Sequence, residues 1–208
     1  MAIFDMKIRD FTEELRAKTP TPGGGGAAAI TGALGAALVM MATEFTIENE
    51  KYQDVEFIAK SIRAKMSPIY MNLLMMADQD KMAYEKVAAA LKMPKETEEE
   101  KAARDEALSA AYYISAKVCL NTMDLCHGGL QGIADAAGVT NPNLDSDLVV
   151  AYHHFVAGFR SAKHLIHQNI PGIASEKDRN LYNENVDIFV EKHAELVEKI
   201  KTKLGIED

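Results

Sequence analysis

Four consecutive glycines, residues 23–26, lead directly into the most apolar stretch of this chain, AAAITGALGAALVMMA. Alanine and leucine favour a helix, whereas glycine loosens the backbone. The stretch is apolar or small on every side, and a helix without a polar face is normally buried all round. The sequence therefore predicts a buried central helix from about Ala27 to Thr46, and a glycine-rich turn just before it.

The remainder of the chain reads as helices separated by breakers. A long amphipathic segment contains Pro68, where a kink is expected. Thr97 and Glu100 have the spacing of a capping box, which predicts a helix start. The pair Gly128-Gly129 is expected to end that helix. Helices are expected over residues 3–18, 27–46, 51–91, 97–126, 130–137, 145–169 and 176–203.

No segment shows a convincing strand alternation, an internal repeat or an interdomain linker. Asp145 or Ser146 is expected to cap the helix that follows the turn-rich loop GVTNPNLDSD. The 208 residues suit one domain, so we expect a single all-α domain over residues 1–208. Its architecture is predicted to be a multihelical array around the buried central helix.

Charge and composition narrow the class of partner. The formal net charge is −8, which argues against a broad nucleic-acid surface because such surfaces need clustered Lys and Arg. The apolar run from Ala27 to Ala42 is shorter than a membrane span. Cys119 and Cys126 lie about 10 Å apart along one helix face, too far for a disulfide, and suit buried free thiols. A cytoplasmic protein without a membrane or nucleic-acid partner is expected.

The glycine run has two interpretations that the residues alone leave open. It can be structural, because glycine permits tight backbone conformations where the chain enters the core. It can also be functional, because bare amides at a helix N-terminus attract an anion and let a flat ligand approach the backbone. A phosphate loop is not indicated, because GK[ST] is absent and no strand precedes the glycines.

The glycine region PTPGGGGAAAITGALGAAL, with EFTIENEKY after it, closely resembles the cyclodeaminase/cyclohydrolase family. That family includes the C-terminal domain of formiminotransferase-cyclodeaminase and free-standing bacterial methenyltetrahydrofolate cyclohydrolases. The stretches ADQDKMAYEKVAAALKMPKETEEEKAAR and NPNLDSDLVVA support the resemblance, which covers roughly residues 8–170. Three positions depart from the pattern: Gly26 replaces a frequent serine, Tyr112 stands at a proline, and Leu165 replaces an asparagine.

The resemblance implies a methenyltetrahydrofolate cyclohydrolase-like fold and a homodimer with its folate pocket near the dimer interface. The implied reaction is hydrolysis of 5,10-methenyltetrahydrofolate to 10-formyltetrahydrofolate. Two alternatives stay open, namely a formimidoyltetrahydrofolate cyclodeaminase that releases ammonia and a non-catalytic folate-binding helical protein. Both reactions need a group that moves protons and a negative group that tolerates a cationic ring, and neither needs a cofactor or a metal.

Carboxylates suit these duties, and the resemblance points to Asp80, which matches an acidic position of the family. Lys51 matches a basic position and could carry protons or pair with the glutamate tail of folate; an ordinary surface lysine is the alternative. Asp147 could cap a helix or face the pocket. The catalytic candidates are therefore Asp80, Lys51 and Asp147. The substrate-binding candidates are Pro22, Gly23, Gly24, Gly25, Gly26, Tyr52, Tyr84, Asn141, Asn143 and Asn169.

Three histidines offer a rival interpretation. His153, His164 and His167 fall near one helix face and could together bind zinc. The chain has no HExxH motif, and any carboxylate ligand would have to come from elsewhere. A polar helix face or a subunit contact is the favoured interpretation of these residues.

Overall fold

The computed structural model describes residues 2–207, which form helices and turns without a strand. The prediction of an all-α fold is confirmed. The α-helices are α1 Ile8–Leu15, α2 Gly24–Glu44, α3 Glu56–Leu91, α4 Glu98–Ala136, α5 Asp145–Asn169 and α6 Glu176–Leu204. Short 3-10 helices are η1 Ile3–Asp5, η2 Glu50–Val55, η3 Pro142–Leu144 and η4 Ile170–Gly172.

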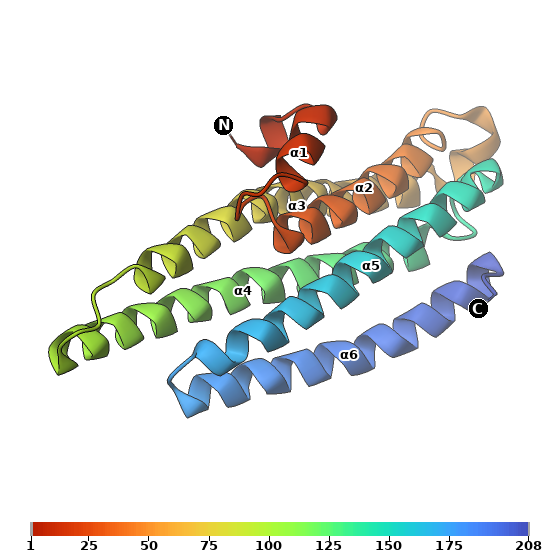
Figure 1. The fold of residues 1–208 in the computed structure, drawn as a ribbon. Coiled ribbons are helices and arrows are strands. Elements are labelled where there is room, and N and C mark those ends of the chain that lie inside the picture. The colour runs from red at the N-terminus through yellow and green to blue at the C-terminus, as the bar shows by residue number, and fades with distance from the viewer. Residues whose placement is uncertain (1, 208) are drawn as a thin grey trace.

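The five long helices α2 to α6 lie side by side, and successive helices run in opposite directions (Figure 1). Helix α2 packs against α3, α4 and α5, as expected of a central helix. Small residues allow this close approach. A Cβ at Gly32 would lie 2.9 Å from the sulfur of Cys126, and one at Gly35 would lie 3.1 Å from the carbonyl oxygen of Ala151.

One side of α2 is not covered, so the prediction of burial on every side is wrong for that side. Leu34 is 49% exposed, and Phe45, which follows the helix, is 58% exposed. By length and composition alone, α2 could cross a membrane. Its packing against three neighbouring helices accounts for much of that apolar character. An exposed apolar face remains on the single chain.

Two predicted helix boundaries are wrong because glycines that were expected to interrupt a helix lie inside it and allow close packing. Helix α2 begins at Gly24, three residues earlier than expected, so three of the four glycines form its first turn. Helix α4 runs through Gly128-Gly129 to Ala136, and the short helix expected over residues 130–137 is its last part. A Cβ at Gly129 would lie 2.1 Å from the ring of Phe155, so a glycine is needed for α4 to contact α5.

The other helix boundaries agree with the predictions only in part. The Thr97–Glu100 capping box is present, with the Glu100 N–H donating to the Thr97 hydroxyl at 3.2 Å. Helix α5 is not capped by Asp145 or Ser146: its N-cap is Leu144, without a side-chain cap, and Asp145 lies in the first turn. The expected first helix is η1 followed by α1, and α3 starts after η2. Pro68 lies inside α3, which continues through it.

Candidate functional site

A cleft of about 360 Å³ opens where the N-terminal end of α2 meets α3, α4 and the C-terminal end of α5. Its wall combines the glycine segment with one carboxylate, two tyrosines and several apolar side chains. The residues that line it are Pro20, Thr21, Gly23, Gly24, Gly25, Asp80, Tyr84, Val87, Leu91, Tyr112, Ser115, Cys119, Leu165 and Asn169.

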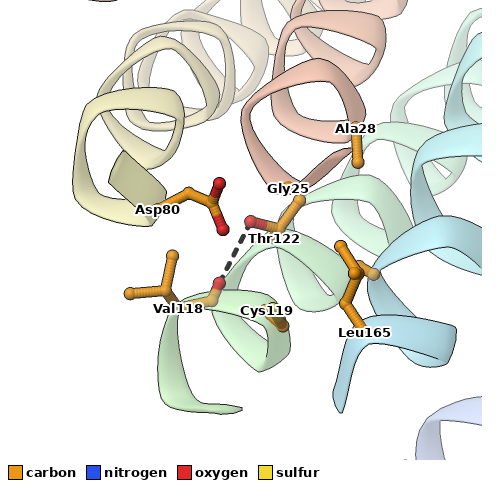
Figure 2. Close-up of a pocket in the computed structure, with 8 residues that line it drawn as sticks. Gly25, Ala28, Asp80, Val118, Cys119, Thr122 and Leu165 are labelled. Atoms are coloured by element: carbon orange, nitrogen blue, oxygen red, sulfur yellow. Dashed lines mark hydrogen bonds between the residues drawn. The ribbon is translucent and has the colours of Figure 1, made fainter. Parts of the chain in front are cut away.

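Asp80 lines both this cleft and a small adjoining space, and it connects α3 to α2. Its Oδ2 accepts a hydrogen bond of 2.9 Å from the N–H of Gly26, in the first turn of α2. Figure 2 shows its carboxylate directed toward Gly25. A Cβ at Gly25 would lie 2.0 Å from Oδ1 of Asp80, so only a glycine leaves room for the carboxylate. Asp80 thus supplies the N-terminal cap that Gly23 lacks, from another helix.

The electrostatics of Asp80 combine two opposed effects. Burial raises the pKa of its carboxyl above the ordinary value, and the Gly26 N–H opposes that rise by stabilising the anion. The carboxylate also lies at the positive end of the α2 dipole. A carboxyl with a raised pKa in a cleft exchanges protons nearer neutral pH than a surface aspartate does.

The floor beneath Asp80 is dry and chemically inert. Thr122 donates its hydroxyl to the carbonyl of Val118 at 3.0 Å (Figure 2), and the space there is too small for a water molecule. Burial, and then the charge of Asp80, raise the pKa of the Cys119 thiol to about 12. A thiol this weakly acidic is not a nucleophile near neutral pH. Cys119 and Cys126 are both free and buried, as expected.

Asp78, one of two neighbouring acids on α3, has a different role from Asp80. Its Oδ1 accepts a hydrogen bond of 2.5 Å from the N–H of Ile3 in η1. This bond fastens the N-terminal segment next to α2, where the side chain of Ile3 would lie 3.8 Å from a Cβ at Gly26. Asp78 therefore anchors backbone beside the cleft, and Asp80 alone of the two reaches into it.

The predicted site residues fall into two groups at opposite ends of α2. The cleft group contains Gly23, Gly24, Gly25, Asp80, Tyr84 and Asn169 as lining residues. Gly26 contacts this group through its N–H bond to Asp80, and Pro22 is buried next to it without lining the cleft. Asn169 donates to the Leu165 carbonyl at 2.8 Å and approaches the sulfur of Cys119 at 3.9 Å.

The second group lies near the C-terminal end of α2, about 30 Å away along its 21 residues. The hydroxyl of Tyr52 donates to Oδ1 of Asn141 at 3.0 Å. The same oxygen accepts from the N–H of Asn143, and the N–H of Asn141 donates to the Thr46 hydroxyl. The remaining members of this group are exposed Lys51 and half-buried Asp147.

Within one chain, the predicted residues do not form a single combined site. Lys51 and Asp147 lie outside the cleft that contains Asp80, so within one chain they do not share a site with it. Asp147 does not cap α5 either, because the N-cap is Leu144. The side chain of Asn141 satisfies the local backbone, because its Oδ1 accepts the N–H of Asn143.

The zinc interpretation finds no geometric support in residues 2–207. No group of three or more His, Cys, Asp or Glu side chains among them is arranged to hold a metal ion. His153, His164 and His167 are exposed on α5. This exposure is what a polar helix face or a subunit contact requires.

Sequence reasoning missed the part of the cleft wall formed by α4 and the outer part of α3. Those residues follow helical spacing: Val87 and Leu91 continue the face of Asp80 and Tyr84, and Tyr112, Ser115 and Cys119 share one face of α4. The periodicity was visible in the sequence. What could not be read was which face of α4 meets which face of α3.

Comparisons with known proteins identify the family of this chain. Residues 7–187 match the family described as formiminotransferase-cyclodeaminase. The chain is 38% identical over 166 residues to methenyltetrahydrofolate cyclohydrolase of Methylorubrum extorquens, which covers 80% of each chain. It is 28% identical over 150 residues to formimidoyltransferase-cyclodeaminase of Rattus norvegicus, where it spans only 28% of that protein.

A solved structure shares the whole fold. Formiminotetrahydrofolate cyclodeaminase from Thermotoga maritima superimposes with a TM-score of 0.86 at 26% identity. The match covers 97% of this chain and 96% of that one. The likeness therefore extends over all six α-helices and includes the elements that build the cleft.

Proposed function

This chain belongs to the formiminotransferase-cyclodeaminase family, and we propose that it is an enzyme that hydrolyses 5,10-methenyltetrahydrofolate to 10-formyltetrahydrofolate. One observation carries the proposal beyond family membership. The glycine segment holds a single carboxylate, Asp80, in the wall of a cleft large enough for a small planar ligand. The relative from Methylorubrum extorquens, which is 38% identical, is named for this activity.

The proposed chemistry uses Asp80 in two ways. The substrate carries a positive charge spread over N5, the methenyl carbon and N10, and a nearby carboxylate stabilises that charge. Water attacks the methenyl carbon and gives one proton to Asp80, which leaves a neutral tetrahedral carbon bearing a hydroxyl group. The C–N5 bond then breaks, the hydroxyl becomes the formyl carbonyl, and N5 takes up a proton. One proton is released overall.

The surrounding residues of the cleft have binding roles in this proposal. The first N–H groups of α2 point toward its N-terminal end without intrahelical partners. That of Gly26 donates to Asp80, and the others suit the polar edge of the pterin. The side chains of Tyr84, Val87 and Leu91 form an apolar wall along α3 for the flat parts of the ligand. Neither a cofactor nor a metal is assigned a step.

A homodimer is part of the proposal, and the outer face of α2 supports it. Leu34 and Phe45 leave an apolar surface along this helix that a second copy would cover. If two α2 helices pack antiparallel about a two-fold axis, the glycine end of one chain approaches the Tyr52–Asn141 end of its partner. Such a dimer would unite the two groups of predicted site residues, including Lys51. We place this enzyme in the cytoplasm.

A cyclodeaminase is the second candidate, favoured by the fold shared with the Thermotoga maritima protein. It would act on formiminotetrahydrofolate through a related tetrahedral carbon and release ammonia. The same cleft and the same carboxylate would serve that reaction. The 38% identity to the cyclohydrolase, against 26% and 28% to the cyclodeaminases, places the cyclohydrolase first.

The two candidates separate in one pair of assays. Purified protein should accelerate the loss of the near-ultraviolet absorbance of methenyltetrahydrofolate over buffer, with the same rate after treatment with a chelator. Ammonia release from formiminotetrahydrofolate, with methenyltetrahydrofolate left intact, would replace the proposal with the second candidate. Binding of a folate without turnover of either substrate would leave only the non-catalytic alternative.

A further inference from the structure

Two tyrosines enter the cleft from facing helices at nearby depths. Helices α3 and α4 run antiparallel, so outward steps of four and then three residues lead from Asp80 to Tyr84 and Val87. The same steps on α4 lead from Cys119 to Ser115 and Tyr112. Tyr112 therefore lies about 10 Å outward from Cys119, opposite the outer part of the α3 wall, and Tyr84 lies about 6 Å outward from Asp80.

The ring of Tyr112 packs closely against the backbone at the end of η4. Gly172, the last residue of η4, presents its bare Cα to this ring, and a Cβ there would lie 2.1 Å from Cδ2 of Tyr112. Tyr112 is half-buried and packs against the main core, whereas Tyr84 is 41% exposed at the cleft rim. The ring of Tyr112 is thus fixed by its packing, whereas the ring of Tyr84 on the facing helix is accessible to solvent.

The chemistry of the substrate determines which of its parts reaches these rings. The reacting carbon lies between the pterin and the p-aminobenzoyl ring, and the glutamate tail is attached to the latter. A charged tail keeps its hydration by pointing out of the cleft, past Val87 and Leu91. When the reacting carbon is near Asp80, the benzoyl ring therefore occupies the level of the two tyrosines.

We propose that Tyr112 is a specificity-determining residue that, together with Tyr84, holds the p-aminobenzoyl ring, with Gly172 keeping the Tyr112 ring in position. This inference rests on the proposed function, because it assumes a folate in the cleft. Stacked or edge-on aromatic contacts account for about a 3- to 10-fold effect on binding. Tyr112 acts on the aryl half of the ligand and leaves the pterin half to the glycine end.

The test compares two ligands that differ in the aryl half. 5-Formyltetrahydrofolate carries the p-aminobenzoylglutamate group, and 6-methyltetrahydropterin lacks it. In calorimetric titrations, Tyr112→Leu should weaken binding of 5-formyltetrahydrofolate about 3- to 10-fold and leave that of 6-methyltetrahydropterin unchanged. Tyr112→Phe should bind both as the wild type does. Tyr113→Leu is the matched control, because Tyr113 contacts Tyr182 outside this cleft.

Gly172→Ala provides an independent variant in which the Tyr112 ring is kept but displaced. It should weaken 5-formyltetrahydrofolate binding in the wild-type background and add little in the Tyr112→Leu background, because the displaced ring is then absent. Turnover should show the same pattern as a raised KM with kcat little changed.

Each outcome decides the inference. Equal losses for both ligands would assign Tyr112 a merely structural role, and no loss for either would remove it from the site. The wild-type protein could fail to hydrolyse methenyltetrahydrofolate while Tyr112→Leu still shows the ligand-selective loss of binding. That result would support the role of the two tyrosines and refute the proposed activity. A wild-type protein that hydrolyses methenyltetrahydrofolate but binds neither compound would overturn the inference and leave the proposed activity standing.

Discussion

The closest contact in the cleft, between Gly25 and Asp80, leads to the sharpest prediction. In Gly25→Ala the new Cβ would lie 2.0 Å from Oδ1 and 2.7 Å from Oδ2 of Asp80. The carboxylate must therefore withdraw by about 1.4 Å to reach an ordinary contact distance of 3.4 Å. Because its Oδ2 accepts the Gly26 N–H at 2.9 Å, the withdrawal breaks or weakens that bond.

The expected magnitudes separate activity from stability. A misplacement of about 1 Å at a reacting group costs on the order of 100-fold in turnover. Losing a hydrogen bond to a charged group costs about 1.5–3 kcal/mol, and replacing glycine by alanine in a helix returns about 0.5–1 kcal/mol. The net loss in the free energy of unfolding is therefore about 0.5–2.5 kcal/mol, which leaves the protein folded.

The assay pairs methenyltetrahydrofolate turnover with denaturant unfolding of the same preparations. Gly24→Ala is the control for the helix effect, because no atom lies within 4 Å of its new Cβ, and it should stabilise the protein by a few tenths of a kcal/mol up to about 1 kcal/mol. A Gly25→Ala protein with wild-type turnover would refute the reasoning. So would a loss of turnover explained wholly by unfolding.

The remaining predictions concern packing, pH and assembly. Gly129→Ala should lower the free energy of unfolding by about 1–3 kcal/mol in denaturant titrations, since its Cβ would meet the Phe155 ring at 2.1 Å; an unchanged midpoint would contradict this. Burial lowers the pKa of His193 from 6.5 to about 4. The contribution of the neutral ring to the free energy of unfolding is therefore complete above pH 6.5 and is lost as the pH falls toward 4, by roughly 3 kcal/mol at most. His193→Phe, which keeps an aromatic ring stacked on Phe159, should flatten that dependence, and an equally steep profile in the variant would count against it. Leu34→Glu should shift the protein to monomers in sedimentation runs if α2 forms the dimer contact, whereas an undisturbed dimer would exclude that face.

Much of the fold can be predicted from local sequence patterns. The apolar stretch after the glycines predicts the central helix, and the Thr97–Glu100 spacing predicts the start of α4. Both are set by neighbouring residues in the chain. The helix end predicted at Gly128-Gly129 is wrong, because a glycine pair has the same local pattern whether it ends a helix or makes room for a neighbouring ring. The ring in question belongs to Phe155, which lies 26 residues away from Gly129 in the sequence.

The site was predictable only in part, for the same physical reason. The glycine run is distinctive by itself, whereas Asp80 stands out only through its match to an acidic position of the family. The structure joins them through one hydrogen bond. Tyr112 carries no local signal for its place in the cleft, because its role depends on the register of α4 against α3. Lys51 was grouped with Asp80, although the length of α2 separates them, because sequence order does not reveal distance.

The measurement that tests the central claim most directly is the kcat/KM of Asp80→Asn for methenyltetrahydrofolate, set beside its unfolding midpoint. The amide keeps an oxygen that can accept the Gly26 N–H, but it cannot take a proton from water. We expect kcat/KM to fall at least about 100-fold with little change in stability. The acid limb of the wild-type pH–rate profile should lie above the ordinary aspartate pKa, because burial raises that of Asp80. A folded Asp80→Asn enzyme with kcat/KM close to the wild-type value would contradict the claim.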